Sequence, residues 1–149
     1  MVVGSGPLTL PRSLHARLFD FQQQGVEWLW QLHNRVPHGG VLGDDMGLGK
    51  TIQVAAFLSC LFRARLARTA VGVAPVSVVP QWQSELQTWA GDAVLVRQYH
   101  GTSQKERAAA LAAVVADKGK GADGQSGRVL VTTYGMVQSQ AEALAPKGF

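Results

Sequence analysis

The sequence is poor in cysteine and in charge. Cys60 is the single cysteine of the 149 residues, which excludes an internal disulfide and leads us to expect a reducing compartment. Only 16% of the residues are charged, but 46% are hydrophobic, and that balance excludes wholesale disorder. No histidine stands beside a cysteine at metal-ligand spacing, so we expect no zinc site.

Long apolar segments are also missing. The apolar run at 54–62, which contains Cys60, is too short to span a bilayer. The first residues lack a basic segment followed by a long apolar stretch, so we expect no secretory signal. These absences predict a soluble, intracellular protein without membrane association. Within its apolar run, Cys60 is expected to be a small core residue rather than a catalytic thiol.

What is present suits one α/β domain. The chain is long enough for one such domain with a real core, and we divide it into a lead-in segment at 1–13 and a domain at 14–149. Patterns of apolar residues, glycine and proline predict strands at 41–42, 71–75, 93–99 and 129–134. They predict helices at 18–34, 50–68, 81–89, 106–117 and from 135 to about 145, with a loop at 118–128. Strands that alternate with helices imply a parallel sheet with helices on both faces.

Residues 43–51 carry the strongest chemical signal. They read Gly-Asp-Asp-Met-Gly-Leu-Gly-Lys-Thr, between a predicted strand and a predicted helix, which is the context of a phosphate-binding P-loop. Glycines let the backbone curl so that N–H groups face phosphate oxygens, and the following helix adds the positive end of its dipole. Lys50 would neutralise the β- and γ-phosphates of a nucleotide, and Thr51 would offer a hydroxyl to Mg²⁺.

One position departs from the strict pattern. G-x-x-x-x-G-K-[ST] requires glycine at 44, where this chain has Asp44, and Gly43 stands one place early. The alternative reading is an ordinary glycine-rich turn between a strand and a helix. The combination of Gly47, Gly49 and Lys50 in the required order favours the P-loop.

The loop resembles that of the Swi/Snf-type helicase-like ATPases, which usually reads D-E-M-G-L-G-K-T. Upstream, 18–29 is similar to the adenine-recognition segment of that family, in which the amide of Gln22 would read the adenine edge. The alternative for Gln22 is a solvated residue at the start of a helix. The resemblance implies the following nucleotide-binding residues: Gln22, Asp44, Asp45, Met46, Gly47, Leu48, Gly49, Lys50 and Thr51.

Further landmarks of the same family lie downstream, at 74–85, at 99–101 and at 132–134. In relatives the first of these regions meets the DNA backbone, and a helix N-terminus attracts phosphate. The resemblance implies DNA contacts at Ser77, Gln81, Thr132 and Thr133. Trp82 is expected to be a core residue rather than one that stacks on a base.

The region at 18–33 looks closest to the Cockayne syndrome B-like branch of excision-repair ATPases. Membership would imply a RecA-like P-loop NTPase lobe and a DNA-dependent ATPase, which is a hydrolase acting on acid anhydrides, using ATP and Mg²⁺. It would imply translocation along double-stranded DNA in chromatin remodelling or DNA repair, in the nucleus, with nucleosomes or transcription machinery as partners. The net charge of +4 agrees weakly with a polyanionic partner.

The sequence D-E-x-H, which supplies the catalytic carboxylates in that family, is absent from the 149 residues. We therefore expect a lobe that is incomplete at its C-terminus and a chain that by itself hydrolyses no ATP. Two alternatives remain open. One is a P-loop NTPase that does not act on nucleic acid, and the other is a non-catalytic nucleotide-binding or interaction module.

Overall fold

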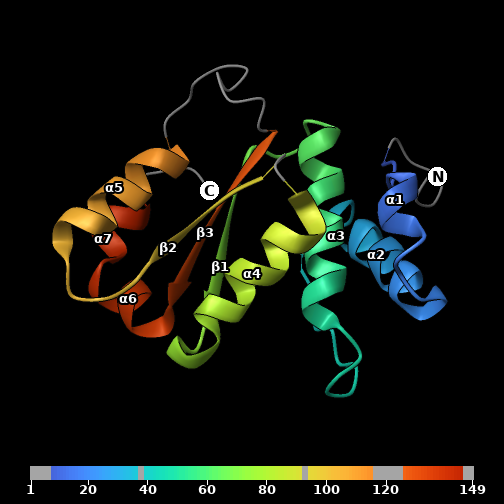
Figure 1. Cartoon of the computed structure of the whole chain (residues 1–149), viewed down its shortest axis with the longest axis horizontal. Helices are drawn as coiled ribbons and strands as arrows, with labels where there is room; N and C mark the ends of the chain where they lie inside the picture. The colour runs from blue at the N-terminus through green and yellow to red at the C-terminus, as the bar shows by residue number, and fades with distance from the viewer. Residues whose placement is uncertain (1–7, 37–38, 92–93, 116–125, 146–149) are drawn as a thin grey trace.

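A computed structural model describes residues 8–36, 39–91, 94–115 and 126–145. The elements form layers (Figure 1), with a sheet between two groups of helices and a further helical layer outside one of these groups. In the described part of the chain, no helix combines the length and the apolar character needed to cross a membrane.

The sheet is parallel, as the alternation of strands and helices predicts. Its strand order is β1-β3-β2, and both β1 and β2 run parallel to the central β3. Nearly all residues of β3 are buried, as expected for a strand covered on both faces. The strands are β1 (Thr69–Ala74), β2 (Val94–Tyr99) and β3 (Gly127–Thr133).

Helices cover both faces of this sheet. On one face, Phe62 of α3 and Leu86 of α4 pack with Val131 of β3 in a common apolar cluster. On the other face, Leu130 of β3 packs with Val114 of α5 in a second cluster, since successive residues of a strand point to opposite faces. The covering helices are α3 (Lys50–Arg63) and α4 (Val79–Ala90) on the first face, and α5 (Gln104–Val115), α6 (Tyr134–Ser139) and α7 (Ala141–Leu144) on the second. The fold is thus the predicted α/β arrangement, consistent with a RecA-like lobe.

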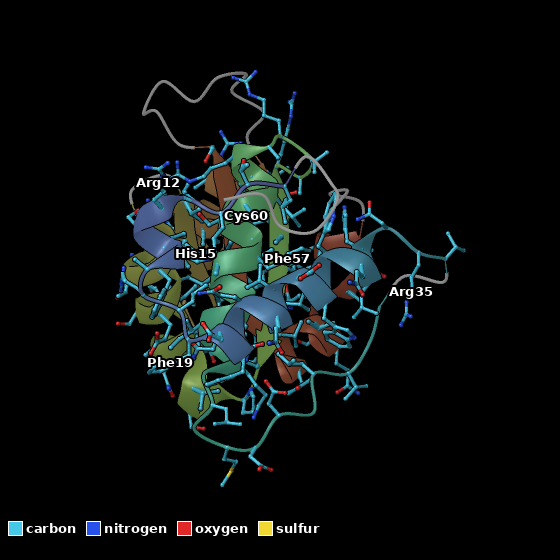
Figure 2. All side chains as sticks on the ribbon, turned by 90° about the vertical axis from the view of Figure 1, so that its right-hand side faces the viewer. Arg12, His15, Phe19, Arg35, Phe57 and Cys60 are labelled. Carbon is cyan, nitrogen blue, oxygen red and sulfur yellow. The ribbon has the colours of Figure 1, made fainter. Side chains whose placement is uncertain are left out.

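The outer helical layer consists of α1 (Arg12–His15) and α2 (Asp20–His33). In Figure 2 these two helices face the viewer, with α3 behind them. Val26 and Trp30 of α2 pack with Cys60 of α3 in a third cluster, which also contains the buried Leu8 and Leu10. The last residues of the segment that the sequence predicts to be a lead-in therefore contribute to a core.

The predicted strand at 41–42 is wrong. Val41 is 86% exposed, and residues 39–45 have no regular secondary structure. Two apolar residues between glycines form a strand only where a neighbour supplies ladder hydrogen bonds, and no described strand pairs with them. The segment is an extended connection from α2 to α3.

Helix bounds also differ from the prediction, most clearly in α3 and in the C-terminal helix. α3 ends at Arg63 rather than near 68, because Arg65 adopts a left-handed backbone with φ of 57°. Leu66 N donates to Leu61 O and Arg65 N to Phe62 O, which is the Schellman arrangement that closes a helix. The predicted C-terminal helix is divided at Gln140, whose ψ of 25° with φ of −124° is not helical.

Residues 118–125 of the predicted loop lie outside the described residues, whereas 127 and 128 already belong to β3.

Candidate nucleotide-binding site

The candidate loop occupies the connection that leads into α3. Figure 1 shows this connection extending beyond the first turn of α3, at the end of the molecule where α4 and α6 also begin. In a parallel α/β sheet this is the edge formed by the carboxyl ends of the strands, which is where ligands bind in such folds. The topology therefore places the loop where a ligand site is expected.

The glycines of the loop adopt the conformations that a curled backbone needs. Gly47 has φ of 85° and Gly49 has φ of 75°, values that other residues rarely adopt. Gly49 is the N-cap of α3, and its carbonyl accepts the first helical hydrogen bond, from Gln53 N at 3.0 Å. Leu48 N reaches Asp45 O at 3.4 Å and tightens the turn. Gly49, with its left-handed backbone, lies directly before the 14-residue helix α3. The first amides of this helix therefore face the loop.

Lys50 lies on the inner side of this turn. Its Nζ atom donates to Asp44 O at 2.7 Å and to Asp45 O at 2.9 Å. The ammonium group is thus held at the centre of the loop by two carbonyl oxygens. Phosphate oxygens could replace those carbonyls as acceptors of the same donors, with a stronger, charge-assisted bond.

The remaining loop residues are largely open to solvent. Met46 is 95% exposed, Leu48 is 40% exposed and Asp45 is also exposed. Thr51, the residue expected to offer a hydroxyl to Mg²⁺, is half-buried in the first turn of α3. The loop therefore presents one half-buried lysine beside exposed loop residues, which is a suitable composition for holding a phosphate chain.

Gln22 is not a solvated residue, because its side chain is 4% exposed. Its Oε1 accepts from Phe19 N at 3.1 Å, as in a capping box at the start of α2, and its Nε2 donates to Leu48 O at 3.2 Å. Beside it the rings of Phe19 and Phe21 stack with centroids 5.8 Å apart, and both rings are exposed. The structure therefore places Gln22 against the loop backbone, and its role toward adenine stays a prediction.

Gln53 belongs to the same arrangement, although no motif in the sequence singles it out. Its side chain is fully buried, and Nε2 donates to Asp44 Oδ2 at 2.8 Å. Oε1 has no hydrogen-bond partner among the described residues and lies against Gly25 of α2. The signal that could have revealed it is an amide at position 53, just before the apolar run at 54–62.

The candidate DNA contacts divide into two groups. Ser77, in the short 3-10 helix η1 (Val76–Val78), and Gln81, in the first turn of α4, are both exposed beyond the carboxyl end of β1. Thr133 is 6% exposed and accepts from Met136 N at 3.3 Å as the N-cap of α6. Thr132 is fully buried and its hydroxyl donates to Tyr99 O at 2.7 Å, so its side chain is not available to a phosphate in this structure. Trp82 is half-buried and packs against the sheet cluster.

Comparison with known proteins identifies the family. The profile of the SNF2-related domain matches residues 21–147. The chain is 41% identical to "Protein CHROMATIN REMODELING 24" of Arabidopsis thaliana over 91% of its own length and 12% of that protein. It is 36% identical to "DNA excision repair protein ERCC-6-like" of Danio rerio over 98% of its length and 9% of the relative.

A third relative concerns the branch of the family to which the chain is similar. "DNA excision repair protein CSB" of Oryza sativa subsp. japonica is 45% identical over 56% of the chain and 7% of that protein. The expected resemblance to the Cockayne syndrome B-like branch is confirmed by these matches, and the chain spans about a tenth of the length of such relatives. Because the matched domain covers most of the described residues, from α2 to α7, the chain belongs to the SNF2-related domain family.

Proposed function

We propose that this chain is the ATP-binding part of an ATP-dependent translocase that moves along double-stranded DNA in chromatin remodelling or DNA repair. The observation that carries the proposal is Lys50, held inside a loop with left-handed Gly47 and Gly49 at the start of a long helix. This combination of a fixed cation, a curled backbone and a helix N-terminus suits a polyphosphate.

The residues present fit a nucleotide with its magnesium ion. Lys50 would pair with the β- and γ-phosphates, and the backbone of 45–49 would surround them. Thr51 would contribute its hydroxyl to Mg²⁺, which when bound neutralises phosphate charge. Gln22 would use the N–H that does not bond Leu48 for the adenine edge, because an amide nitrogen has two donors.

The nucleic-acid part of the proposal is supported by the names of the relatives, which refer to chromatin remodelling and excision repair. Exposed Ser77 and Gln81 lie at the same sheet edge as the loop, where they could donate to phosphates of DNA without reading its sequence. Nucleosomes or transcription machinery would be partners of the protein, in the nucleus.

Two alternatives make different predictions. A P-loop NTPase unrelated to nucleic acid would bind nucleotide without any response to DNA. A non-catalytic interaction module would bind nucleotide no better than a variant without Lys50. The family to which the chain belongs favours neither alternative.

Isothermal calorimetry with ATP and Mg²⁺ tests the nucleotide part. We expect Lys50→Ala to weaken binding about a hundredfold, because two phosphates lose the cation that pairs with them. Lys105→Ala, which removes an exposed lysine on α5, should leave the affinity unchanged. Equal affinity of both variants would contradict the proposed site.

Fluorescence anisotropy with a labelled duplex tests the DNA part. We expect binding that weakens steeply as salt increases, since each neutralised phosphate releases a counterion. Ser77→Glu should weaken duplex binding and leave ATP binding intact, because it places a carboxylate at the proposed contact. ATP binding without any duplex binding would support the alternative NTPase.

A further inference from the structure

Gln53 is a buried polar residue beside the nucleotide site, with no proposed contact to the nucleotide. It stands one turn after Lys50 in α3 and has no exposed surface. Its Nε2 donates to Asp44 Oδ2 at 2.8 Å, whereas its Oε1 has no partner in the part of the chain that the structure describes. Buried amides normally form hydrogen bonds with both their nitrogen and their oxygen. An unpaired oxygen therefore indicates that a demand other than its own hydrogen bonding fixes the side chain in this position.

That demand is visible on both sides of the amide. An added Cβ on Gly25 would lie 1.8 Å from Gln53 Oε1, so α2 approaches the amide closely only because residue 25 has no side chain. On the other side, Asp44 is bonded twice. Its carboxylate accepts from Gln53, and its carbonyl accepts from Lys50 Nζ at 2.7 Å. The contacts run from α2 through Gln53 and Asp44 to Lys50.

We infer that Gln53 is a positioning residue that fixes the phosphate loop through the Asp44 carboxylate and thereby sets the place of Lys50. Asp44 stands where the general P-loop pattern has glycine. A side chain at this position gives the loop a fixed attachment to α3 that a glycine could not provide. The inference deepens the nucleotide site and rests on the proposed function.

Exchanging the donor and the acceptor of the bond between Gln53 and Asp44 tests this positioning role in the full chain. Gln53→Glu opposes two carboxylates at hydrogen-bond distance, and we expect it to weaken binding of ATP with Mg²⁺ about tenfold, since like charges at this separation repel strongly when covered. Gln53→Glu combined with Asp44→Asn reverses the bond, so that the amide introduced at position 44 donates to the carboxylate introduced at position 53, and most of the affinity should return. Asp44→Asn alone keeps an uncharged, weaker acceptor for Gln53, so its affinity should lie between those of the parent chain and Gln53→Glu. Lys105→Ala, which changes an exposed lysine of α5, is the control that should bind as well as the parent chain.

A merely structural role would give another pattern. In that case the losses of affinity would follow melting temperature, and the double variant would be no better than Gln53→Glu. Equal affinity of Gln53→Glu and the parent chain, or failure of the double variant to recover, would overturn the inference.

Amide hydrogen exchange of residues 43–49, measured without nucleotide, separates this inference from the proposed function. We expect faster exchange in Gln53→Glu and recovery in the double variant. If the parent chain bound no nucleotide but exchange followed this pattern, the proposed function would fail and the positioning role would stand. If Lys50-dependent binding were present but exchange were the same in all variants, the positioning role would fail alone.

Discussion

Burial raises the pKa of the Cys60 thiol to about 12 from its usual 9.0, against a smaller lowering by the Arg63 charge. The folded chain therefore keeps the thiol proton at pH values where the unfolded chain loses it. The contribution of this thiol to the free energy of unfolding is fully present below about pH 9. It falls as the pH rises toward 12, by up to about 1.4 kcal/mol per pH unit. The residue belongs to the helical core and lies away from the loop.

Alkaline unfolding of a Cys60→Ala variant tests that assignment. Between about pH 8 and about pH 10 we expect the parent chain to lose about 1 kcal/mol more of its free energy of unfolding than the variant does. Urea titrations at both pH values give this difference directly, and other titrating groups cancel because both proteins share them. Parallel losses in the two proteins would show that the thiol is not sequestered.

Gly25 offers a second test at single-residue scale. Gly25→Ala would push a methyl group into the covered Gln53 amide, and we expect a loss of about 1–3 kcal/mol despite the better helix propensity of alanine. Gly135→Ala is the matched control, because Gly135 is also helical and no atom of the described residues lies near its added Cβ. Thermal or urea unfolding measures both, and the control should be neutral or stabilised by up to about 1 kcal/mol. A destabilised control with an unaffected Gly25→Ala would reverse the interpretation.

These residues also show what the sequence could and could not predict. Gly47, Gly49 and Lys50 were recognisable because their chemistry depends on neighbours along the chain. Gln53 was not, because its partners come from α2 and from the loop and meet it only when the helices pack. The assignment of Gln22 to the nucleotide stays a prediction. Its bond to Leu48 of the loop was not predictable, because that contact depends on the docking of α2 against α3.

At the scale of elements, apolar periodicity located the helices and most of the strands, since each buries a regular face. The failures concern ends and partners. A two-residue strand at 41–42 could be excluded only by knowing that no described strand lies beside it. The end of α3 is set by the left-handed backbone of Arg65, a position where the sequence has no glycine to indicate a helix end.

The stability of α6 should depend on the residue that caps its N-terminus. Thr133 caps the helix through its hydroxyl, which accepts from Met136 N. Thr133→Ala should lower the free energy of unfolding by about 1 kcal/mol, whereas Thr133→Ser keeps the acceptor and should cost less. Urea unfolding measures this, and duplex binding by the same two variants separates the cap from the expected DNA contact. If Thr133→Ala weakened DNA binding without loss of stability, the contact would be the main role.

For the molecule as a whole, the β1 edge is one of the two edges of the described sheet, since β2 also pairs with β3 alone. Among the described strands, β1 pairs with β3 alone, and apolar side chains near it are exposed, including Val76 at 59% and Tyr134 at 65%. An unpaired edge with apolar surface favours self-association. We expect the isolated chain to bind a dye for exposed apolar surface, and Val76→Lys with Val137→Lys should reduce that fluorescence. Sharp cooperative melting with no dye binding would argue against this expectation.

The final prediction concerns hydrolysis, which needs more than a held nucleotide. Carboxylates must hold Mg²⁺ and orient the attacking water, and the 149 residues contain no D-E-x-H sequence. Of the two acidic residues in the loop, Asp44 uses its carboxylate to accept from Gln53. We therefore expect the chain to bind ATP but release phosphate no faster than Lys50→Ala, with or without duplex DNA. A phosphate-release assay that gave DNA-stimulated turnover above that control would require a carboxylate from elsewhere in the chain, and Asp45, which is exposed on the loop, would be the first residue to replace.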